Sequence, residues 1–181
     1  MRIFSNDTVA IAIDLQTKLL PAIDNWKKIV ENSEKLIKGL NILGVPVIVT
    51  EQYKKGLGDT HETIKNALNE YNPFDKITFS AYADMDIKEK IDSLNVKNII
   101  IFGTEAHVCV LQTIIDLRES GYNVFIVEDC SGSRNKNDKK YAIKRAEYEG
   151  ACPVTMEAVL FELTGVSQTE RFKNILKIVK W

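Results

Sequence analysis

Runs of apolar residues that stop abruptly at a polar or small residue most constrain the fold of this chain. Residues 98–103 read Asn-Ile-Ile-Ile-Phe-Gly, and residues 8–14 read Thr-Val-Ala-Ile-Ala-Ile-Asp. Neither run alternates apolar with polar side chains, as a strand with one solvated face would. Such runs are typical of strands that are buried on both faces within a parallel sheet.

Segments with helical periodicity separate these runs, so strands and helices are expected to alternate. The expected strands are at 8–13, 45–50, 74–79, 98–103, 123–127 and 152–155. The expected helices are at 24–43, 61–68, 87–94, 106–120 and 138–148, with a helical remainder. This order predicts an α/β fold with a doubly wound, mainly parallel six-stranded sheet and helices on both faces, as in Rossmann-like proteins. At 181 residues, we expect one domain, 1–181.

Composition excludes several classes of protein. Lys and Arg number 24 against 25 Asp and Glu, which leaves a net charge of −1 and no overall basic character for binding nucleic acid. No apolar run approaches the roughly 20 residues of a membrane span, and residues 1–10 resemble neither a signal peptide nor a transit sequence. We therefore expect a cytoplasmic protein with no nucleic-acid or membrane partner.

The three cysteines are Cys109, Cys130 and Cys152. An odd number with no Cys-x-x-Cys pair fits neither a disulfide framework nor a cysteine-rich zinc site, so at least one thiol is expected to be free. We expect Cys130 and Cys152 to be buried and inert, which leaves Cys109 as the thiol of interest.

Cys109 belongs to a set of three reactive residues at predicted strand ends. Asp14 ends the first strand, Lys76 lies in the third, and Cys109 follows the fourth near the start of a helix. Ligand sites in such folds form beyond the carboxyl ends of the strands. A helix start and a lysine would favour the thiolate, a carboxylate could accept the thiol proton, and helix N–H groups could stabilise an oxyanion. The set therefore predicts acyl transfer through a thioester, although a lone cysteine is more often a small buried apolar residue and a lone lysine more often a solvated surface charge.

Several segments resemble the isochorismatase-like cysteine hydrolase superfamily, and most closely the isochorismatase domain-containing proteins. These segments are Asp14-Leu15-Gln16, the stretch 49–58, Lys76 to Tyr82, Gly103 to Val110, and 121–134. The resemblance covers about residues 8–165. It implies that Asp14 is the proton acceptor, Lys76 the orienting cation and Cys109 the nucleophile. It also implies a cis peptide between Thr104 and Glu105 and an oxyanion hole made by the backbone N–H groups of Glu105 and Cys109.

The resemblance also bears on cofactors, substrates and assembly. Metal-binding relatives carry an Asp- and His-rich stretch after the second strand, whereas residues 50–61 contain one His and no Asp-x-His pair. We therefore expect no metal and no cofactor, and a small amide, carbamoyl or related acyl substrate. Relatives commonly assemble, so a homo-oligomer is expected. The candidate substrate contacts are Gln16, Gln52, Tyr53, Phe79, Tyr82 and His107.

Other functions remain open at this point. The chain could be a weakly active or inactive oligomeric ligand-binding protein that retains the three residues. It could also be a nicotinamidase-type amidase, or a redox sensor in which Cys109 pairs with Cys130 or Cys152 in space.

Overall fold

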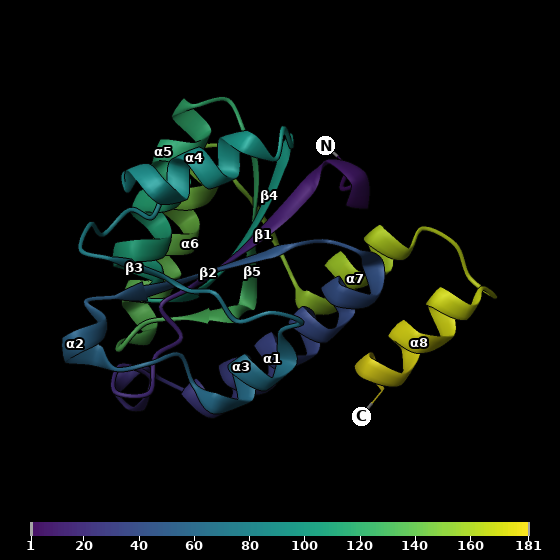
Figure 1. The fold of residues 1–181 in the computed structure, drawn as a ribbon, viewed down its shortest axis with the longest axis horizontal. Coiled ribbons are helices and arrows are strands. Elements are labelled where there is room, and N and C mark those ends of the chain that lie inside the picture. Colours follow the sequence, from purple (N-terminus) through teal and green to yellow (C-terminus); the bar gives the residue numbers. More distant parts are fainter. Residues whose placement is uncertain (1, 181) are drawn as a thin grey trace.

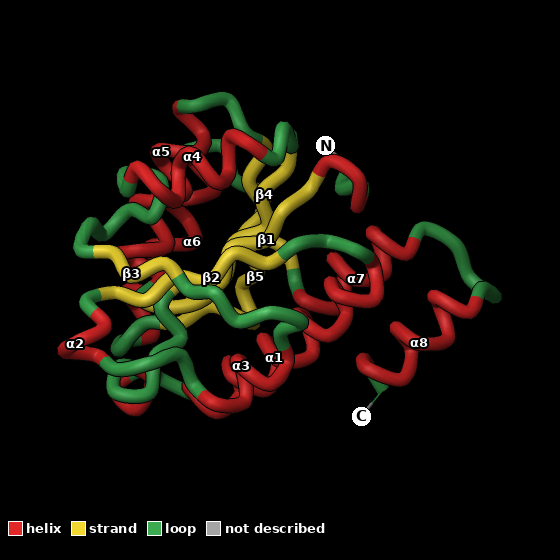
Figure 2. The backbone as a smooth tube through the Cα atoms, viewed as in Figure 1, coloured by secondary structure: helices red, strands yellow, loops and turns green. Residues whose placement is uncertain are grey.

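The computed structural model describes residues 2–180, and in this part of the chain six strands form one all-parallel sheet (Figures 1 and 2). The strand order is β3-β2-β1-β4-β5-β6. The strands are β1 (Thr8–Ile13), β2 (Val47–Gln52), β3 (Phe74–Lys76), β4 (Asn98–Thr104), β5 (Asn123–Gly132) and β6 (Cys152–Val154). The doubly wound α/β fold predicted from the sequence is confirmed.

Helices cover both faces of the sheet (Figure 1). They are α1 (Trp26–Leu43), α2 (Lys54–Leu57), α3 (Glu62–Ala67), α4 (Met85–Ser93), α5 (Leu111–Glu119), α6 (Lys136–Tyr148), α7 (Met156–Thr164) and α8 (Glu170–Val179). One core lies between the sheet and α1, α3, α7 and α8, and the other lies between the sheet and α4, α5 and α6. Alternate residues of β1 point into the two cores, which explains why its sequence is apolar throughout.

The second strand begins two residues later than expected. The N–H of Val45 donates to the carbonyl of Leu40 at 3.0 Å, so Val45 closes the end of α1 instead of starting β2. The strand continues to Gln52, because β3 pairs with it as far as that residue. These two contacts move β2 from the expected 45–50 to Val47–Gln52.

The third and fifth strands also differ from expectation. The third ends at Lys76, because the following chain curls back and turns the carbonyls of Thr78 and Phe79 toward the Lys76 side chain. The fifth runs on to Gly132 through a register shift opposite 101–103. The chain direction beyond a strand thus depends on tertiary contacts that periodicity does not reveal.

The sheet reverses its winding direction between β1 and β4, which are neighbours although four α-helices and two strands separate them in the chain. In open α/β sheets the crevice at such a reversal, beyond the carboxyl ends of the strands, is where ligands bind. Asp14 directly follows β1, and Glu105 directly follows β4. The topology therefore brings the predicted reactive segments to one edge of the sheet.

The structure tests the expected burial of the two cysteines outside the site. Cys130 is buried, as expected, but the prediction that Cys152 is buried is wrong. Cys152 begins β6, the edge strand of the sheet, and is therefore partly exposed. Over residues 2–180, no helix is long and apolar enough to cross a membrane.

Gly103 gives a test of how tightly β1 and β4 approach each other. Its φ is 127°, and a Cβ at this position would lie 2.0 Å from the carbonyl oxygen of Ile13. We expect Gly103→Ala to lower the free energy of unfolding by roughly 2–5 kcal/mol, through backbone strain and overpacking together. Denaturant unfolding of the variant and the wild type measures this loss.

Gly121→Ala is the matched control, because Gly121 also has a positive φ, 91°, but no atom lies within 4 Å of an added Cβ. We expect this control to lose about 1–2 kcal/mol, the strain of the backbone alone. Equal losses in the two variants would contradict the close approach of the strands.

Candidate active site

Asp14 is held rigidly at the end of β1. Its φ of 51° turns the chain out of the sheet, and its backbone N–H donates to the carbonyl of Thr50 at 3.2 Å. The Thr50 hydroxyl donates to Asp14 Oδ1 at 2.7 Å, and the Thr104 hydroxyl donates to the Asp14 carbonyl at 2.7 Å. Asp14 is fully buried, and these bonds leave Oδ2 for other donors.

Lys76 reaches that second oxygen. Its ammonium donates to Asp14 Oδ2 at 2.9 Å and to Gln52 Oε1 at 2.6 Å, with the carbonyls of Thr78 and Phe79 at 3.1 and 3.3 Å. The residue is only 1% exposed. A charge at such a site is stable only when it is paired and hydrogen-bonded, and both conditions are met here.

Cys109 faces this ion pair from a π-helical turn, Ala106–Val110, that precedes α5. Asp14, Lys76 and the backbone of Glu105 all lie close enough to the thiol to change its pKa. The Cys109 carbonyl accepts from the Thr113 hydroxyl at 2.7 Å, which fixes the turn against α5. The structure therefore brings Asp14, Lys76 and Cys109 together.

The resting thiol is protonated, contrary to the expectation that a helix start and a lysine would favour the thiolate. Burial is the main cause that raises the pKa of Cys109 to about 12, and the negative charge of Asp14 adds to it. Lys76 and the Glu105 backbone act in the opposite direction but do not outweigh these two effects. The sulfur therefore needs a base at the moment of attack.

The segment between β4 and the π-helical turn has an unusual backbone. The peptide between Thr104 and Glu105 is cis. The Glu105 carbonyl accepts from the N–H groups of Val108 and Val110 at 3.1 and 3.2 Å, and its carboxylate pairs with Arg134 at 2.6 Å. Glu105 is thus held from both its backbone and its side chain beside the sulfur of Cys109.

A buried carboxylate on the other side of β2 anchors the loop that follows this strand. Glu51 accepts from the N–H and hydroxyl of Thr60 at 2.6 and 2.8 Å and from the Tyr71 hydroxyl, and Lys54 lies 3.1 Å from its second oxygen. Burial tends to raise the pKa of Glu51, but these hydrogen bonds outweigh it and hold the pKa below its ordinary value. The carboxylate therefore stays charged and ties 54–60 to the sheet.

The candidate substrate contacts fall into two groups. Tyr53 and Phe79 are 56% and 55% exposed at the turns that follow β2 and β3. By contrast, the Tyr82 hydroxyl donates to Asp92 at 2.8 Å, and its ring meets Tyr122 edge-on. Tyr82 therefore bonds to α4 and packs against the residue before β5, within the same apolar core as Cys109.

Gln16, Gln52 and His107 have partners within the protein. Gln16 is buried and bonds to the backbone of Gln52 and Gly58, while Gln52 bonds to Lys76. His107 Nδ1 lies 2.9 Å from the Ser133 hydroxyl.

Sequence reasoning missed Thr50 and named Thr104 only as part of the cis peptide, although the hydroxyls of both donate to Asp14. The available signal was their position, since both are polar residues at the ends of apolar runs beside Asp14 and Glu105. Among residues 2–180, no group of three or more His, Cys, Asp or Glu side chains could hold a metal ion.

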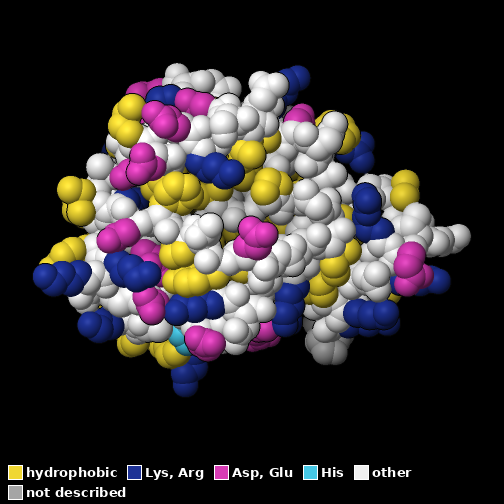
Figure 3. All heavy atoms as spheres, viewed as in Figure 1, with side chains coloured by type: hydrophobic (Ala, Val, Ile, Leu, Met, Phe, Trp, Pro, Cys, Tyr) yellow, Lys and Arg dark blue, Asp and Glu magenta, His cyan; other side chains and the backbone are white. Residues whose placement is uncertain are grey.

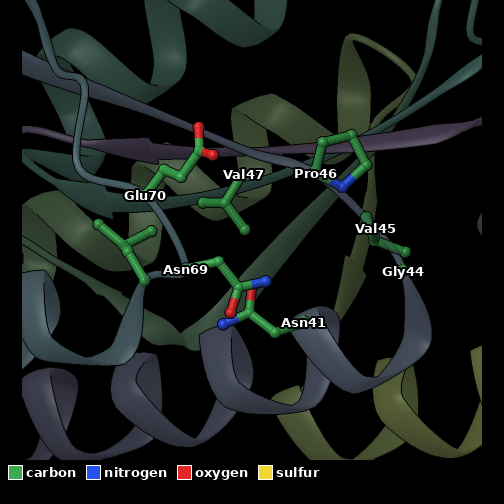
Figure 4. A pocket seen from close by; sticks show the side chains of 8 residues that line it. Asn41, Gly44, Val45, Pro46, Val47, Asn69 and Glu70 are labelled. Carbon is green, nitrogen blue, oxygen red and sulfur yellow. The ribbon is translucent and has the colours of Figure 1, made fainter.

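A large surface hollow lies elsewhere, beside the amino-terminal end of β2 (Figure 4). Its volume is about 540 Å³, and its lining includes Asn41, Val47 and Glu70. The strands are parallel, so this hollow and Asp14 lie at opposite ends of the sheet. None of the three clustered residues lines it, and we do not assign it to the candidate active site.

Comparison with known proteins agrees with the fold. The isochorismatase domain model matches residues 8–158. Isochorismatase family protein 1B of Dictyostelium discoideum is 37% identical, over 96% of this chain and 87% of that protein. Isochorismatase domain-containing protein 1 of Salmo salar is 35% identical, over 96% of this chain and 61% of that protein.

Among solved structures, the one described as MAR1 ribonuclease from Caenorhabditis elegans superimposes with a TM-score of 0.93. It is 40% identical and covers 99% of this chain and 92% of its own. The fold and the family match thus define an α/β domain of the hydrolase type. The chain belongs to the isochorismatase family, as its motifs indicated.

The protonated thiol generates a prediction for alkylation. Iodoacetamide reacts with thiolates, so its rate with Cys109 should still be rising with pH well above about 8.5, where an ordinary thiol is half ionised. Peptide mapping by mass spectrometry separates Cys109 from Cys130 and Cys152.

In Asp14→Asn the negative charge that raises the pKa is removed, so the alkylation profile of Cys109 should move to lower pH. A midpoint for wild-type Cys109 at or below about pH 8.5 would contradict the buried, neutral thiol.

Proposed function

We propose that this chain is a metal-independent cysteine hydrolase that acts on a small amide, carbamoyl or related acyl substrate through a thioester on Cys109. The observation that carries the proposal is the joint placement of Asp14, Lys76 and Cys109 in one buried cluster at the sheet reversal. Membership of the isochorismatase family supports a hydrolase, and a cysteine in this position favours cleavage of C–N bonds.

In the first half of the reaction, Cys109 Sγ attacks the carbonyl carbon while its proton passes to the Asp14 carboxylate. The carbonyl electron pair moves onto oxygen, and the oxyanion is stabilised by the backbone N–H groups of Glu105 and Cys109. The electron pair on oxygen then re-forms the C=O bond as the C–N bond breaks, and the nitrogen takes the proton from Asp14. The amine departs, and the acyl group stays on Cys109 as a thioester.

In the second half, a water molecule attacks the thioester carbonyl and gives a proton to Asp14. When the C–S bond breaks, that proton returns to Cys109 Sγ and the acid product leaves. Asp14 thus acts as base and acid in turn, which suits a carboxylate that is bonded to an ammonium and lies beside the thiol. Lys76 holds the Asp14 carboxylate through a hydrogen bond and opposes the negative charge that develops beside it.

Burial of the cluster supports a substrate of limited size at the reacting end. Asp14 is fully buried, and Cys109 is 6% exposed, so a substrate reaches the sulfur with its carbonyl group while the rest stays outside. Tyr53, Phe79 and Ile77 present exposed apolar surface on the turns after β2 and β3. We extend the proposal to a homo-oligomer that covers these side chains, which light scattering coupled to size-exclusion chromatography tests.

A second candidate is RNA cleavage, because the Caenorhabditis elegans protein of 40% identity is described as a ribonuclease. Cleavage of a phosphodiester needs cations that contact the phosphate, yet Lys76 is buried and fully bonded. Positive and negative side chains are also interspersed on the face shown in Figure 3. These features favour the amide chemistry over the ribonuclease reaction.

The decisive measurement is intact-mass spectrometry after incubation with a panel of small amides and carbamoyl compounds. We expect an acyl adduct on Cys109 with one or more of them, and turnover reduced by at least about 10³-fold in Cys109→Ala. Cys152→Ala is the control, since this partly exposed thiol lies on the edge strand and should leave turnover unchanged.

Full turnover in Cys109→Ala would overturn the mechanism. A labelled RNA cleaved by the wild type and not by Cys109→Ala would establish the ribonuclease alternative. A specific disulfide at Cys109 under mild peroxide, with no amide turnover, would establish the redox alternative.

A further inference from the structure

The ammonium of Lys76 is surrounded by more acceptors than it has protons. It has three N–H bonds, and four oxygens lie within 3.3 Å, from Asp14, Gln52, Thr78 and Phe79. The closest of the four is Gln52 Oε1, at 2.6 Å. Of these acceptors, only Asp14 carries a charge. Gln52 therefore makes the shortest contact with Lys76 without contributing any negative charge.

The orientation of the Gln52 side chain is fixed by its partners. Its Nε2 donates to the carbonyl of Ile77 at 3.1 Å, which leaves Oε1 for Lys76. An ammonium cannot accept and a carbonyl cannot donate, so the reverse orientation of the amide would lose both bonds. The Gln52 backbone is held as well, since its N–H and carbonyl bond to the side chain of Gln16 at 2.7 and 3.1 Å.

We infer that Gln52 is a positioning residue: its side-chain carbonyl holds the Lys76 ammonium against Asp14 and beside Cys109 while keeping the buried cluster electrically neutral. This replaces the expectation that Gln52 contacts the substrate, because both ends of its amide are occupied by the protein. The inference rests on the proposed function in one respect, namely that Cys109 is the nucleophile.

Neutrality matters because the reaction adds a negative charge to this cluster. Asp14 and Lys76 cancel each other while the thiol is protonated, so a thiolate or oxyanion forms beside a pair with no net charge. A carboxylate at position 52 would keep an acceptor for Lys76 but make the cluster negative before the reaction begins. Further negative charge would then form less readily.

Three variants separate these effects. Gln52→Glu keeps an oxygen acceptor for Lys76 and adds a negative charge. Gln52→Met leaves position 52 uncharged and removes the oxygen acceptor. The control is Asn72→Asp, which makes the same amide-to-carboxylate change on an exposed residue two positions before β3. The reaction rate of Cys109 with iodoacetamide is measured against pH by peptide mapping, and thermal melting monitors the fold of each variant.

We expect Gln52→Glu to slow alkylation at about pH 8 by about tenfold and to move the profile up by about one pH unit. Gln52→Met should shift the profile in the same direction but by less, because Lys76 keeps its charge and loses one anchor. Asn72→Asp should match the wild type.

Two results would overturn the inference. One is a Gln52→Glu profile that coincides with that of Asn72→Asp. The other is that Gln52→Glu and Gln52→Met lose alkylation rate equally and melt at lower temperatures, while their pH profiles do not shift. That combination is what a purely structural role of Gln52 would produce. If Gln52→Glu does not fold, a Gln52→Met alkylation profile that coincides with that of the wild type would overturn the inference instead.

Alkylation does not require the protein to be a hydrolase, so the two proposals fail separately. Absence of any acyl adduct on the wild type would reject the proposed function and leave the Gln52 result intact. Unshifted Gln52 variants would reject the positioning role and leave an amide adduct on Cys109 intact.

Discussion

The buried ion pair between Asp14 and Lys76 is the interaction on which the rest of this site depends. Their charged atoms lie 2.9 Å apart with no solvent exposure of either side chain. Removal of one partner from such a pair typically costs about 3–5 kcal/mol, because the other charge stays buried without compensation. The strand ends, the Thr50 hydroxyl and the curl of the chain after β3 all supply bonds to this pair. The local backbone is therefore shaped around two charges.

Desolvation governs the chemistry of Cys109 as strongly as charge does. The same burial that strengthens the pairing of Asp14 with Lys76 keeps the thiol protonated, since the nearest base already carries a negative charge. A preformed thiolate would place a second negative charge beside Asp14. A neutral thiol next to a carboxylate avoids this, and in the proposed reaction the proton moves only when the sulfur forms its new bond. The site is thus neutral at rest.

Much of this arrangement was predictable from the sequence. Buried parallel strands appear as uninterrupted apolar runs, and their carboxyl ends must share one edge, so Asp14, Lys76 and Cys109 could be placed near one another. The direction of single side chains was not predictable. Tyr82 and Gln52 both lie close to site segments in sequence, yet one bonds to Asp92 and the other to Lys76. The raised pKa of Cys109 was also missed, because burial of a helix start depends on what packs over it.

The polarity of the sheet decides which surface can serve the chemistry. Because all neighbouring strands are parallel, the strand ends that carry Gln52 and Lys76 and the residues Asp14 and Glu105 that follow β1 and β4 gather at one end of the sheet. The hollow beside Val47 lies at the other end. The hollow has none of the three reactive residues in its lining, so it cannot serve their chemistry. The turns after β2 and β3 carry the exposed side chains of Tyr53 and Phe79. Under the proposed function, differences in these turns would change the substrate without changing the cluster.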